Sequence, residues 1–181
     1  ISFARARPGQ LNYASAGIGT YPQMTYELFL SMAKLKMVHI PYKGTAPAMI
    51  DMLAGQVATM AATVLTGLPH IRTGRLRPLG ITSAQRNAVV PDIPTVAEGG
   101  LPGYESVQWY AVLAPAQTPR NIIAKLHTEL VQVLHSPEIK KRFAADAAET
   151  VGNTPEEFAR HIRSELDKWE KVAREAGIQP E

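Results

Sequence analysis

The stretch that decides the fold is Leu11-Asn12-Tyr13-Ala14-Ser15-Ala16-Gly17-Ile18-Gly19-Thr20, and a run with helical character follows it from 21 to 34. Residues 11–14 predict a short buried strand, the Ser and Gly residues predict a tight turn, and Leu28 and Met32 mark the apolar stripe of a helix. A strand that leads through glycines into a helix leaves unpaired backbone N–H groups pointing at one place, where the helix dipole also favours negative charge. The stretch therefore predicts an anion-binding turn.

The composition is that of a globular domain with a mild basic balance. The chain has 181 residues, of which 45% are hydrophobic, and a formal net charge of +3. Its Lys and Arg residues are dispersed and are not interleaved with aromatic residues, which argues against a nucleic-acid partner. No window approaches eighteen consecutive apolar residues, so direct membrane insertion is not expected. The absence of cysteine excludes disulfides and thiolate metal sites and is compatible with any compartment.

Strands and helices alternate through the first half of the chain. After the opening strand and helix we expect a strand at 36–42, a helix at 46–54, a strand at 57–64, a helix at 68–73 and a strand at 76–82. Short connections between alternating elements predict a parallel sheet with helices on both faces. The prolines and glycines of the segment that follows indicate the way out of this first domain, which we place at residues 1–103.

The remainder, residues 104–181, is expected to hold one strand at 106–114 and then mostly helices. Three helix starts place a hydroxyl residue ahead of a proline: Thr118-Pro119, Ser136-Pro137 and Thr154-Pro155. The last start adds Glu157 at capping-box spacing, and the same spacing occurs in the short helical turn expected at 95–98. The C-terminal helix shows an apolar stripe from Phe158 to Ala176 and ends at Gly177.

Taken together, these motifs resemble those of the Bug family, the extracytoplasmic solute receptors of tripartite tricarboxylate transporters. The resemblance runs from about Pro8 to the C-terminus. It is carried by Asn12 to Thr20, Pro41-Tyr42-Lys43-Gly44-Thr45-Ala46-Pro47-Ala48, Gly55-Gln56-Val57, Gly74-Arg75-Leu76-Arg77-Pro78-Leu79, Pro91-Asp92-Ile93-Pro94-Thr95-Val96-Ala97-Glu98, Trp109 and Ala114-Pro115-Ala116-Gln117-Thr118-Pro119.

The resemblance implies an α/β fold of the type II periplasmic-binding-protein kind. Residues 1–103 would form one parallel-sheet lobe, and 104–181 would form the hinge strand and the helix-rich C-terminal part of the other lobe. Because the chain begins with Ile1 and not Met, we expect that it is part of a longer protein whose upstream segment carries the rest of that lobe and a signal peptide. The resemblance thus implies a periplasmic receptor that delivers a small organic anion to membrane transporter subunits.

The resemblance also implies which residues hold the carboxylates of the solute, through backbone N–H groups, hydroxyls and ordered water. Carried over residue by residue, these are Ser15, Ala16, Gly17, Gly19 and Thr20 on one turn and Lys43, Gly44 and Thr45 on its neighbour. Both turns would leave the carboxyl ends of parallel strands, where ligands settle in open α/β sheets. No catalytic residue, metal or cofactor is expected. The chain departs from the family pattern at Gln23, where His is usual, at Ala58, where Asp is usual, and at Ala111, where Gly is usual; the first two bear on ligand preference or helix packing.

Several of these residues also have a purely structural interpretation. The glycines of the first turn can serve backbone geometry alone, Thr45 can cap a helix, and Lys43 can be simply solvated. Ser15 lacks the flanking glycine two residues before it that a nucleophile elbow needs. The five histidines show no metal-ligand spacing and are interpreted as surface or core residues, and Trp109 as a packing residue at the seam between lobes.

Two other function classes stay open at this point. An effector-sensing domain of a transcriptional regulator shares the type II architecture and would need a helix-turn-helix segment upstream. A small hydrolase or transferase would turn over an ester or acyl substrate. The two hypotheses are separated from the receptor by the sequence upstream of Ile1 and by the presence or absence of turnover.

Overall fold

The computed structural model describes residues 1–178, which divide into two compact units. The first unit is Ile1–Val107 together with the chain from Lys168 onward, and the second is Gln108–Asp167. The chain therefore crosses between the units twice, after Val107 and after Asp167. Among the described residues, every helix is too short or too polar to cross a bilayer.

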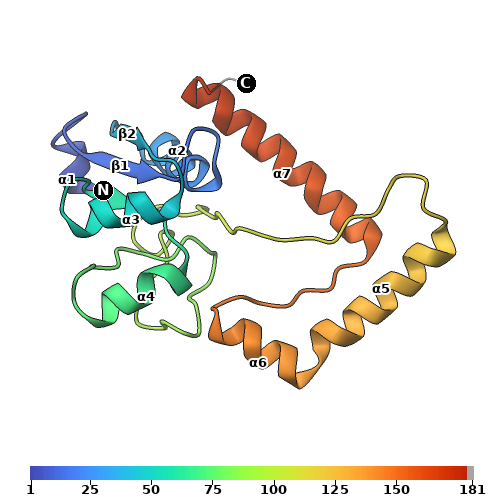
Figure 1. The fold of residues 1–181 in the computed structure, drawn as a ribbon. Coiled ribbons are helices and arrows are strands. Elements are labelled where there is room, and N and C mark those ends of the chain that lie inside the picture. Colours follow the sequence, from blue (N-terminus) through green and yellow to red (C-terminus); the bar gives the residue numbers. More distant parts are fainter. Residues whose placement is uncertain (179–181) are drawn as a thin grey trace. The chain divides into compact units, whose positions relative to one another are not determined.

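A three-stranded parallel sheet forms the centre of the first unit, with the strand order β2-β1-β3 (Figure 1). Its strands are β1 (Asn12–Ser15), β2 (Val38–Pro41) and β3 (Thr59–Met60). The helices that alternate with them are α1 (Ser2–Arg5), α2 (Tyr21–Ala33), α3 (Thr45–Leu53) and α4 (Val64–Arg72). The predicted order of strands and helices through residue 54 is confirmed, with boundaries that shift by one to two residues.

Two adjacent residues of β1 anchor the two cores of this unit. Tyr13 and Ala14 are both fully buried, and because side chains alternate along a strand they face opposite sides of the sheet. Tyr13 belongs to a cluster that includes Leu30 and Ala33 of α2. Ala14 packs with Ala48 of α3, where the small side chains let helix and sheet approach closely. Helices thus cover both faces of β1, as the sequence predicts.

Of the two further strands predicted in this unit, one is shorter than expected and the other is absent. The strand expected at 57–64 shrinks to the two residues of β3, because the hydroxyl of Thr63 accepts a 3.3 Å hydrogen bond from the Thr66 amide and starts α4 there. The strand expected at 76–82 forms no ladder; Ile81 makes only an isolated parallel bridge with Thr95. Apolar character alone does not make a strand when no partner lies alongside it.

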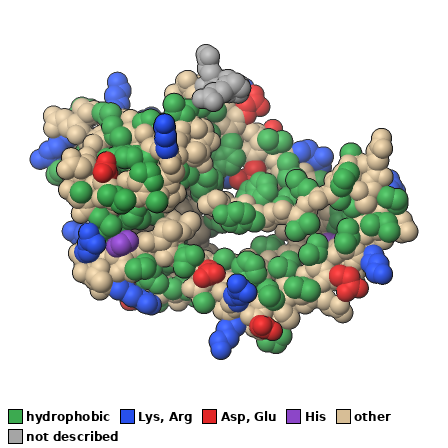
Figure 2. Space-filling model, viewed as in Figure 1, with side chains coloured by type: hydrophobic (Ala, Val, Ile, Leu, Met, Phe, Trp, Pro, Cys, Tyr) green, Lys and Arg blue, Asp and Glu red, His purple; other side chains and the backbone are tan. Residues whose placement is uncertain are grey.

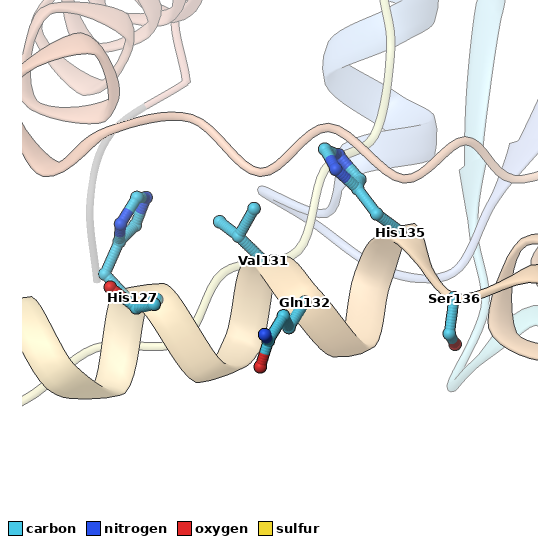
Figure 3. Close-up of a pocket in the computed structure, with 6 residues that line it drawn as sticks. His127, Val131, Gln132, His135 and Ser136 are labelled. Carbon is cyan, nitrogen blue, oxygen red and sulfur yellow. The ribbon is translucent and has the colours of Figure 1, made fainter.

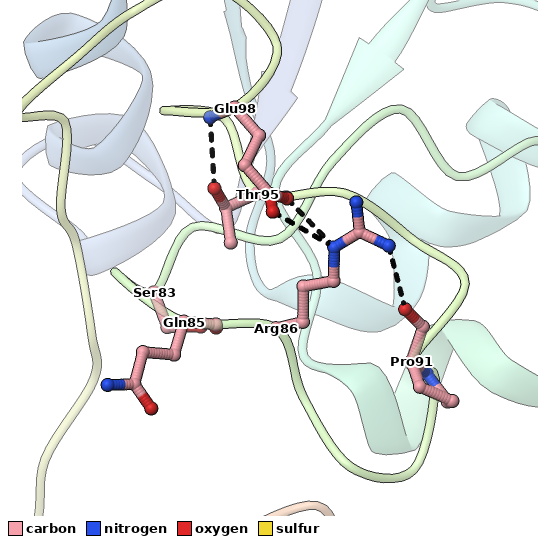
Figure 4. A network of polar contacts seen from close by, with 6 residues as sticks. All are labelled: Ser83, Gln85, Arg86, Pro91, Thr95 and Glu98. Atoms are coloured by element: carbon pink, nitrogen blue, oxygen red, sulfur yellow. Dashed lines mark hydrogen bonds and ion pairs between the residues drawn. The ribbon is translucent and has the colours of Figure 1, made fainter.

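A polar network fixes the connecting segment that follows (Figure 4). The predicted capping box is confirmed, since the Thr95 amide donates to Glu98 Oε2 at 2.7 Å and the Glu98 amide donates to Thr95 Oγ1 at 3.1 Å. Arg86 Nε donates to both oxygens of Glu98, and its Nη1 donates to the carbonyl of Pro91 at 3.2 Å. The Thr95 amide and the Arg86 guanidinium hold the pKa of the Glu98 carboxyl below its usual range.

The second unit consists of α5 (Arg120–His135), α6 (Pro137–Ala145) and most of α7 (Pro155–Ala176). The start of α5 differs from the prediction, because Pro119 and not Thr118 occupies the N-cap position. Ser136 is the N-cap of α6 as predicted, although its hydroxyl donates back to the Val133 carbonyl and caps no amide. The Thr154–Glu157 capping box is confirmed.

The strand expected at 106–114 is also wrong. Within residues 1–178 the segment forms no ladder with another strand, although the Ser106 amide donates to the Thr82 carbonyl, and Tyr110, Val112 and Leu113 are 74–87% exposed. Trp109 packs edge-on against Phe158 and His161 of α7, with ring centroids 5.5 and 5.4 Å away. Trp109 is therefore a packing residue within this unit.

Candidate anion-binding site

The two turns predicted to form the site lie side by side at one edge of the sheet. β1 and β2 run parallel, with Ser15 opposite Pro41, so both strands end at the same edge. Backbone hydrogen bonds continue the pairing into the turns: the Tyr42 amide donates to the Ser15 carbonyl at 3.1 Å, and the Gly44 amide donates to the Ala16 carbonyl at 2.9 Å. The structure thus brings the two halves of the predicted set together.

The first turn runs from Ser15 to Thr20 and is held by its own side chains. The buried Ser15 Oγ accepts from the Gly17 amide at 3.2 Å and donates to the Gly17 carbonyl at 3.0 Å. Thr20 Oγ1 also donates to the Gly17 carbonyl, at 2.7 Å. Gly17 has φ +143° and a Cβ there would lie 3.4 Å from the Tyr42 carbonyl, so glycine suits both the turn and the close approach of its neighbour.

Gln23 is a part of this turn that sequence reasoning noticed only as a departure from the family pattern. It occupies the third helical position of α2, its side chain is only 5% exposed, and its Oε1 accepts a 2.7 Å hydrogen bond from the Gly19 amide. The Gly19 amide is therefore occupied from within the protein. The signal that could have found this contact is a Gln at the third position of a helix, which commonly reaches back to a preceding amide.

The second turn contains Lys43 and Gly44. Gly44 has φ +115° and is the N-cap of α3, so the prediction that Thr45 caps this helix is wrong: Thr45 is its first helical residue and makes no capping hydrogen bond. Glycine suits this N-cap position because it adopts a positive φ without the steric cost that a side chain would bring. Lys43 is exposed, and no acidic side chain of the described chain pairs with it.

Several backbone N–H groups of the two turns are left without a partner inside the protein. Within residues 1–178, no acceptor is found for the amides of Ala16, Ile18, Thr45 and Ala46. The first turns of α2 and α3 contain no acidic residue. Two free amides in the turn before α2, two at the start of α3, one exposed lysine and no acidic residue in either first helical turn form a place that favours an anion.

A network of aromatic and polar side chains from α2, β1 and β2 supports the first turn. The Tyr13 ring stacks between Tyr26 at 4.4 Å and His39 at 4.9 Å, and its hydroxyl donates to Glu27 Oε1. His39 Nε2 in turn lies 2.6 Å from Ser15 Oγ. Burial lowers the pKa of His39, and burial together with Glu27 raises the pKa of the Tyr13 hydroxyl. The network thus joins α2, both strands and the turn.

The Ser15–His39 pair has the distance of a nucleophile and its base, but Ser15 is not placed for such a role. Its side chain is 0% exposed, and its Oγ is bonded to both the amide and the carbonyl of Gly17. A reacting atom must approach such an oxygen closely. The pair therefore supports the turn, in agreement with the interpretation of His39 as a structural residue.

A separate cavity lies in the second unit. A hollow of about 430 Å³ lies along α5 and is lined by His127, Thr128, Val131, Gln132, His135 and Ser136. His127, Val131 and His135 project from one side of this helix, and Gln132 and Ser136 from the other (Figure 3). The projecting side packs on the segment before α7, because His127 Nε2 lies 3.0 Å from the Asn153 carbonyl. In the described part of the chain, no three His, Cys, Asp or Glu side chains gather as metal ligands would.

The surface charges of the chain are dispersed. On the face shown in Figure 2, Lys and Arg side chains are scattered singly among hydrophobic and acidic ones. Two turns that meet at the carboxyl ends of neighbouring parallel strands lie where open α/β sheets bind their ligands. The chain belongs to the tripartite tricarboxylate transporter family receptors, whose family profile matches residues 1–178.

Individual relatives agree with this family membership. The chain is 37% identical over 177 residues to the protein BugT of Bordetella pertussis, covering 98% of this chain and 54% of BugT. It is 36% identical over 173 residues to the UPF0065 protein in the tcbD-tcbE intergenic region of Pseudomonas sp. strain P51, covering 95% of this chain and 52% of that protein. The chain thus spans about half the length of these curated relatives.

Solved structures of related receptors have the same fold. "R. palustris Rpa4515 with adipate" matches with a TM-score of 0.86 and 36% identity over 99% of this chain and 60% of that chain. The periplasmic binding protein BugD matches with a TM-score of 0.81 and 28% identity, over 99% of this chain and 61% of its own. MatC of Rhodopseudomonas palustris with bound malate matches with a TM-score of 0.76 and 30% identity, over 94% and 59%. The predicted fold class is confirmed.

Proposed function

We propose that the protein is a solute receptor that captures a small carboxylate at its two adjoining turns and releases it chemically unchanged. The ligand-binding residues are Ser15, Ala16, Gly17, Gly19, Thr20, Lys43, Gly44 and Thr45. The observation that carries this proposal is the hydrogen bond from the Gly44 amide to the Ala16 carbonyl, which holds the first turn against the start of α3. Free amides on both sides of that bond can receive the oxygens of one anion.

The residues of the two turns contribute in different ways. The amides of Ala16, Ile18, Thr45 and Ala46 are available as donors, and Thr20 Oγ1 can accept or share a water-mediated contact. Ser15 and Gly19 act through the backbone shape of the turn, because the Ser15 hydroxyl and the Gly19 amide are already engaged. Lys43 adds one exposed positive charge on the second turn.

A dicarboxylate, a tricarboxylate or a related organic anion is the ligand class that fits this site. Backbone N–H donors at a helix start, together with a single lysine, suit the oxygens of a carboxylate. The related receptors with adipate and malate support the same class. The described site holds no group placed for bond breaking, so the proposed activity is binding, with no cofactor and no metal.

The cellular role follows from the family. We propose that the protein works in the periplasm, exported by a signal peptide upstream of Ile1, and hands its ligand to the membrane subunits of a tripartite tricarboxylate transporter. In this arrangement residues 1–103 serve as one lobe and 104–181 as the hinge and the C-terminal part of the other. Nucleic acid and direct membrane insertion have no part in it. Family membership and the periplasmic relatives support this role.

Calorimetric titration tests the proposal. Adipate, malate and citrate are titrated separately into the chain at low ionic strength, with dimethyl adipate as a neutral control of the same carbon skeleton. We expect saturable binding of at least one acid and none of the diester, and recovery of the acid unchanged after incubation. Equal heats for acid and diester, or turnover of either, would contradict the proposal.

A further inference from the structure

Tyr21 is the first residue of α2 and directly follows the anion-binding turn. Its hydroxyl lies 2.6 Å from Ser106 Oγ, a partner 85 positions away in the sequence. Its ring meets the ring of Trp169 edge-on, with 5.9 Å between the centroids. One side chain beside the turn therefore touches two segments that are remote in the sequence.

Those two segments are the places where the chain passes between its compact units. Ser106 is the next-to-last residue before the first crossing, which follows Val107, and Trp169 is the second residue after the second crossing, which follows Asp167. Tyr21, Ser106 and Trp169 all belong to the first unit. The contacts of Tyr21 thus connect the turn to both crossings from within one unit.

The contact with Ser106 is part of a buried and fully partnered cluster. Ser106 is 0% exposed, its Oγ also lies 2.9 Å from Thr25 Oγ1, and its amide donates to the Thr82 carbonyl at 2.8 Å. The Tyr104 hydroxyl donates to the Thr25 carbonyl at 3.0 Å. Removing one partner from such a cluster leaves a buried polar atom unsatisfied, so the cluster is expected to keep one arrangement or change as a whole.

We propose that Tyr21 is a positioning residue that couples the shape of the anion-binding turn to the two crossings. A change in the backbone of residues 16–20 moves the start of α2, and the Tyr21 hydroxyl and ring transmit that change to Ser106 and Trp169. The same contacts act in reverse, so the crossings bias the turn toward one geometry. The part of this inference that concerns ligand occupancy rests on the proposed function, whereas the coupling itself does not.

Hydrogen exchange without ligand tests the coupling. Ser106→Ala removes the remote partner, and Tyr21→Phe removes one oxygen while keeping the ring against Trp169. We expect either change to speed exchange of the Gly19 and Thr20 amides, measured by NMR, by roughly three- to tenfold, the scale set by one hydrogen bond. The double variant should add little to Ser106→Ala, because that change already breaks the contact that Tyr21→Phe removes.

Ser31→Ala is the matched control, because it deletes a hydroxyl that donates to Glu175 from the far half of the same helix. It should leave exchange in the turn unchanged. Unchanged exchange in Ser106→Ala and Tyr21→Phe, or equal acceleration in Ser31→Ala, would overturn the coupling. If Ser106→Ala does not fold, Tyr21→Phe decides alone.

Tryptophan fluorescence tests whether ligand binding at the turn is transmitted to Trp169. The chain has two tryptophans, so Trp109→Phe leaves Trp169 as the only indole. We expect adipate or malate to change Trp169 emission in this background, and Tyr21→Phe to reduce that change while calorimetry still detects binding. An identical emission change with and without the Tyr21 hydroxyl would overturn the part of the inference that concerns ligand occupancy. Failure of adipate, malate and citrate all to bind would contradict the proposed function, while the exchange result still decides the coupling.

Discussion

The amide of Gly44 donates a 2.9 Å hydrogen bond to the carbonyl of Ala16, which makes one backbone unit of two turns that lie 28 residues apart. The Gly44 φ of +115° belongs to a region that side chains rarely adopt. The geometry of the proposed site therefore depends on the absence of a side chain at this position.

Replacing Gly44 by Ala should remove anion binding. The substitution is expected to cost about 1 to 3 kcal/mol of unfolding free energy through backbone strain and to displace the amides at the start of α3. Gly55→Ala is the matched control, because Gly55 has φ +75° just beyond the other end of the same helix. Urea unfolding and calorimetry should show destabilisation in both variants but loss of binding only in the first. Retained affinity in Gly44→Ala would remove Gly44 from the site.

Two substitutions of Gln23 test separately the backbone shape of the first turn and the charge near the anion. Gln23→Leu leaves the Gly19 amide without its acceptor and should lower the unfolding free energy by about 1 to 3 kcal/mol. Gln23→Glu keeps the acceptor but adds a negative charge near the anion. Two like charges about 8 Å apart repel by about 2 kcal/mol at an effective dielectric constant of about 20, which predicts a marked, salt-sensitive loss of affinity. Full affinity in Gln23→Glu at low salt would place the anion elsewhere.

Lys43 and Lys36 flank β2 at opposite ends and are both exposed. Lys43→Gln should weaken dicarboxylate binding about two- to tenfold and flatten its salt dependence, because one exposed charge contributes on the order of 1 kcal/mol. Lys36→Gln, which removes the same charge at the other edge of the sheet, should leave binding unchanged. Neither change should alter stability measurably. Titrations at two salt concentrations check this, and equal effects of the two variants would indicate nonspecific attraction.

His39 should make stability depend on pH. Burial lowers the pKa of His39 in the folded protein below its ordinary value of 6.5, while the Glu27 carboxylate partly opposes this effect. The unfolded chain therefore binds a proton first as pH falls through 6.5, and folded stability declines from that pH downward. Urea unfolding between pH 8 and 5 should show this decline in the parent and a smaller one in His39→Gln. A parallel decline in the two proteins would exclude His39 as its source.

The sequence predicts the part of the fold that local signals determine. Gly17 and Gly19 after a buried strand, and Gly44 before a helix, mark backbone positions that few other residues can adopt, so the turns and their helices follow. The segments 76–82 and 106–114 are apolar and read as strands, but a strand needs a partner, and pairing is a nonlocal property. The two incorrect strands therefore come from context that a single stretch does not contain.

The candidate site likewise has one part that the sequence predicts and one part that it does not. That two glycine-containing turns meet follows from parallel strand order, and the structure places them together. The supporting residues Gln23 and His39 were not assigned their roles, because a Gln near a helix start and a His in a strand have many possible partners. Only the folded chain specifies the Gly19 amide for one and the Ser15 hydroxyl for the other.

The most direct test of the central claim is an NMR titration of the ¹⁵N-labelled chain with adipate and malate at up to millimolar concentration. Backbone donors report an anion through their own amide resonances, even when binding is weak. The account predicts that the amides of Ala16, Ile18, Thr45 and Ala46 shift together along one saturation curve. Shifts confined to α5 and α6, or separate curves for the two turns, would contradict it.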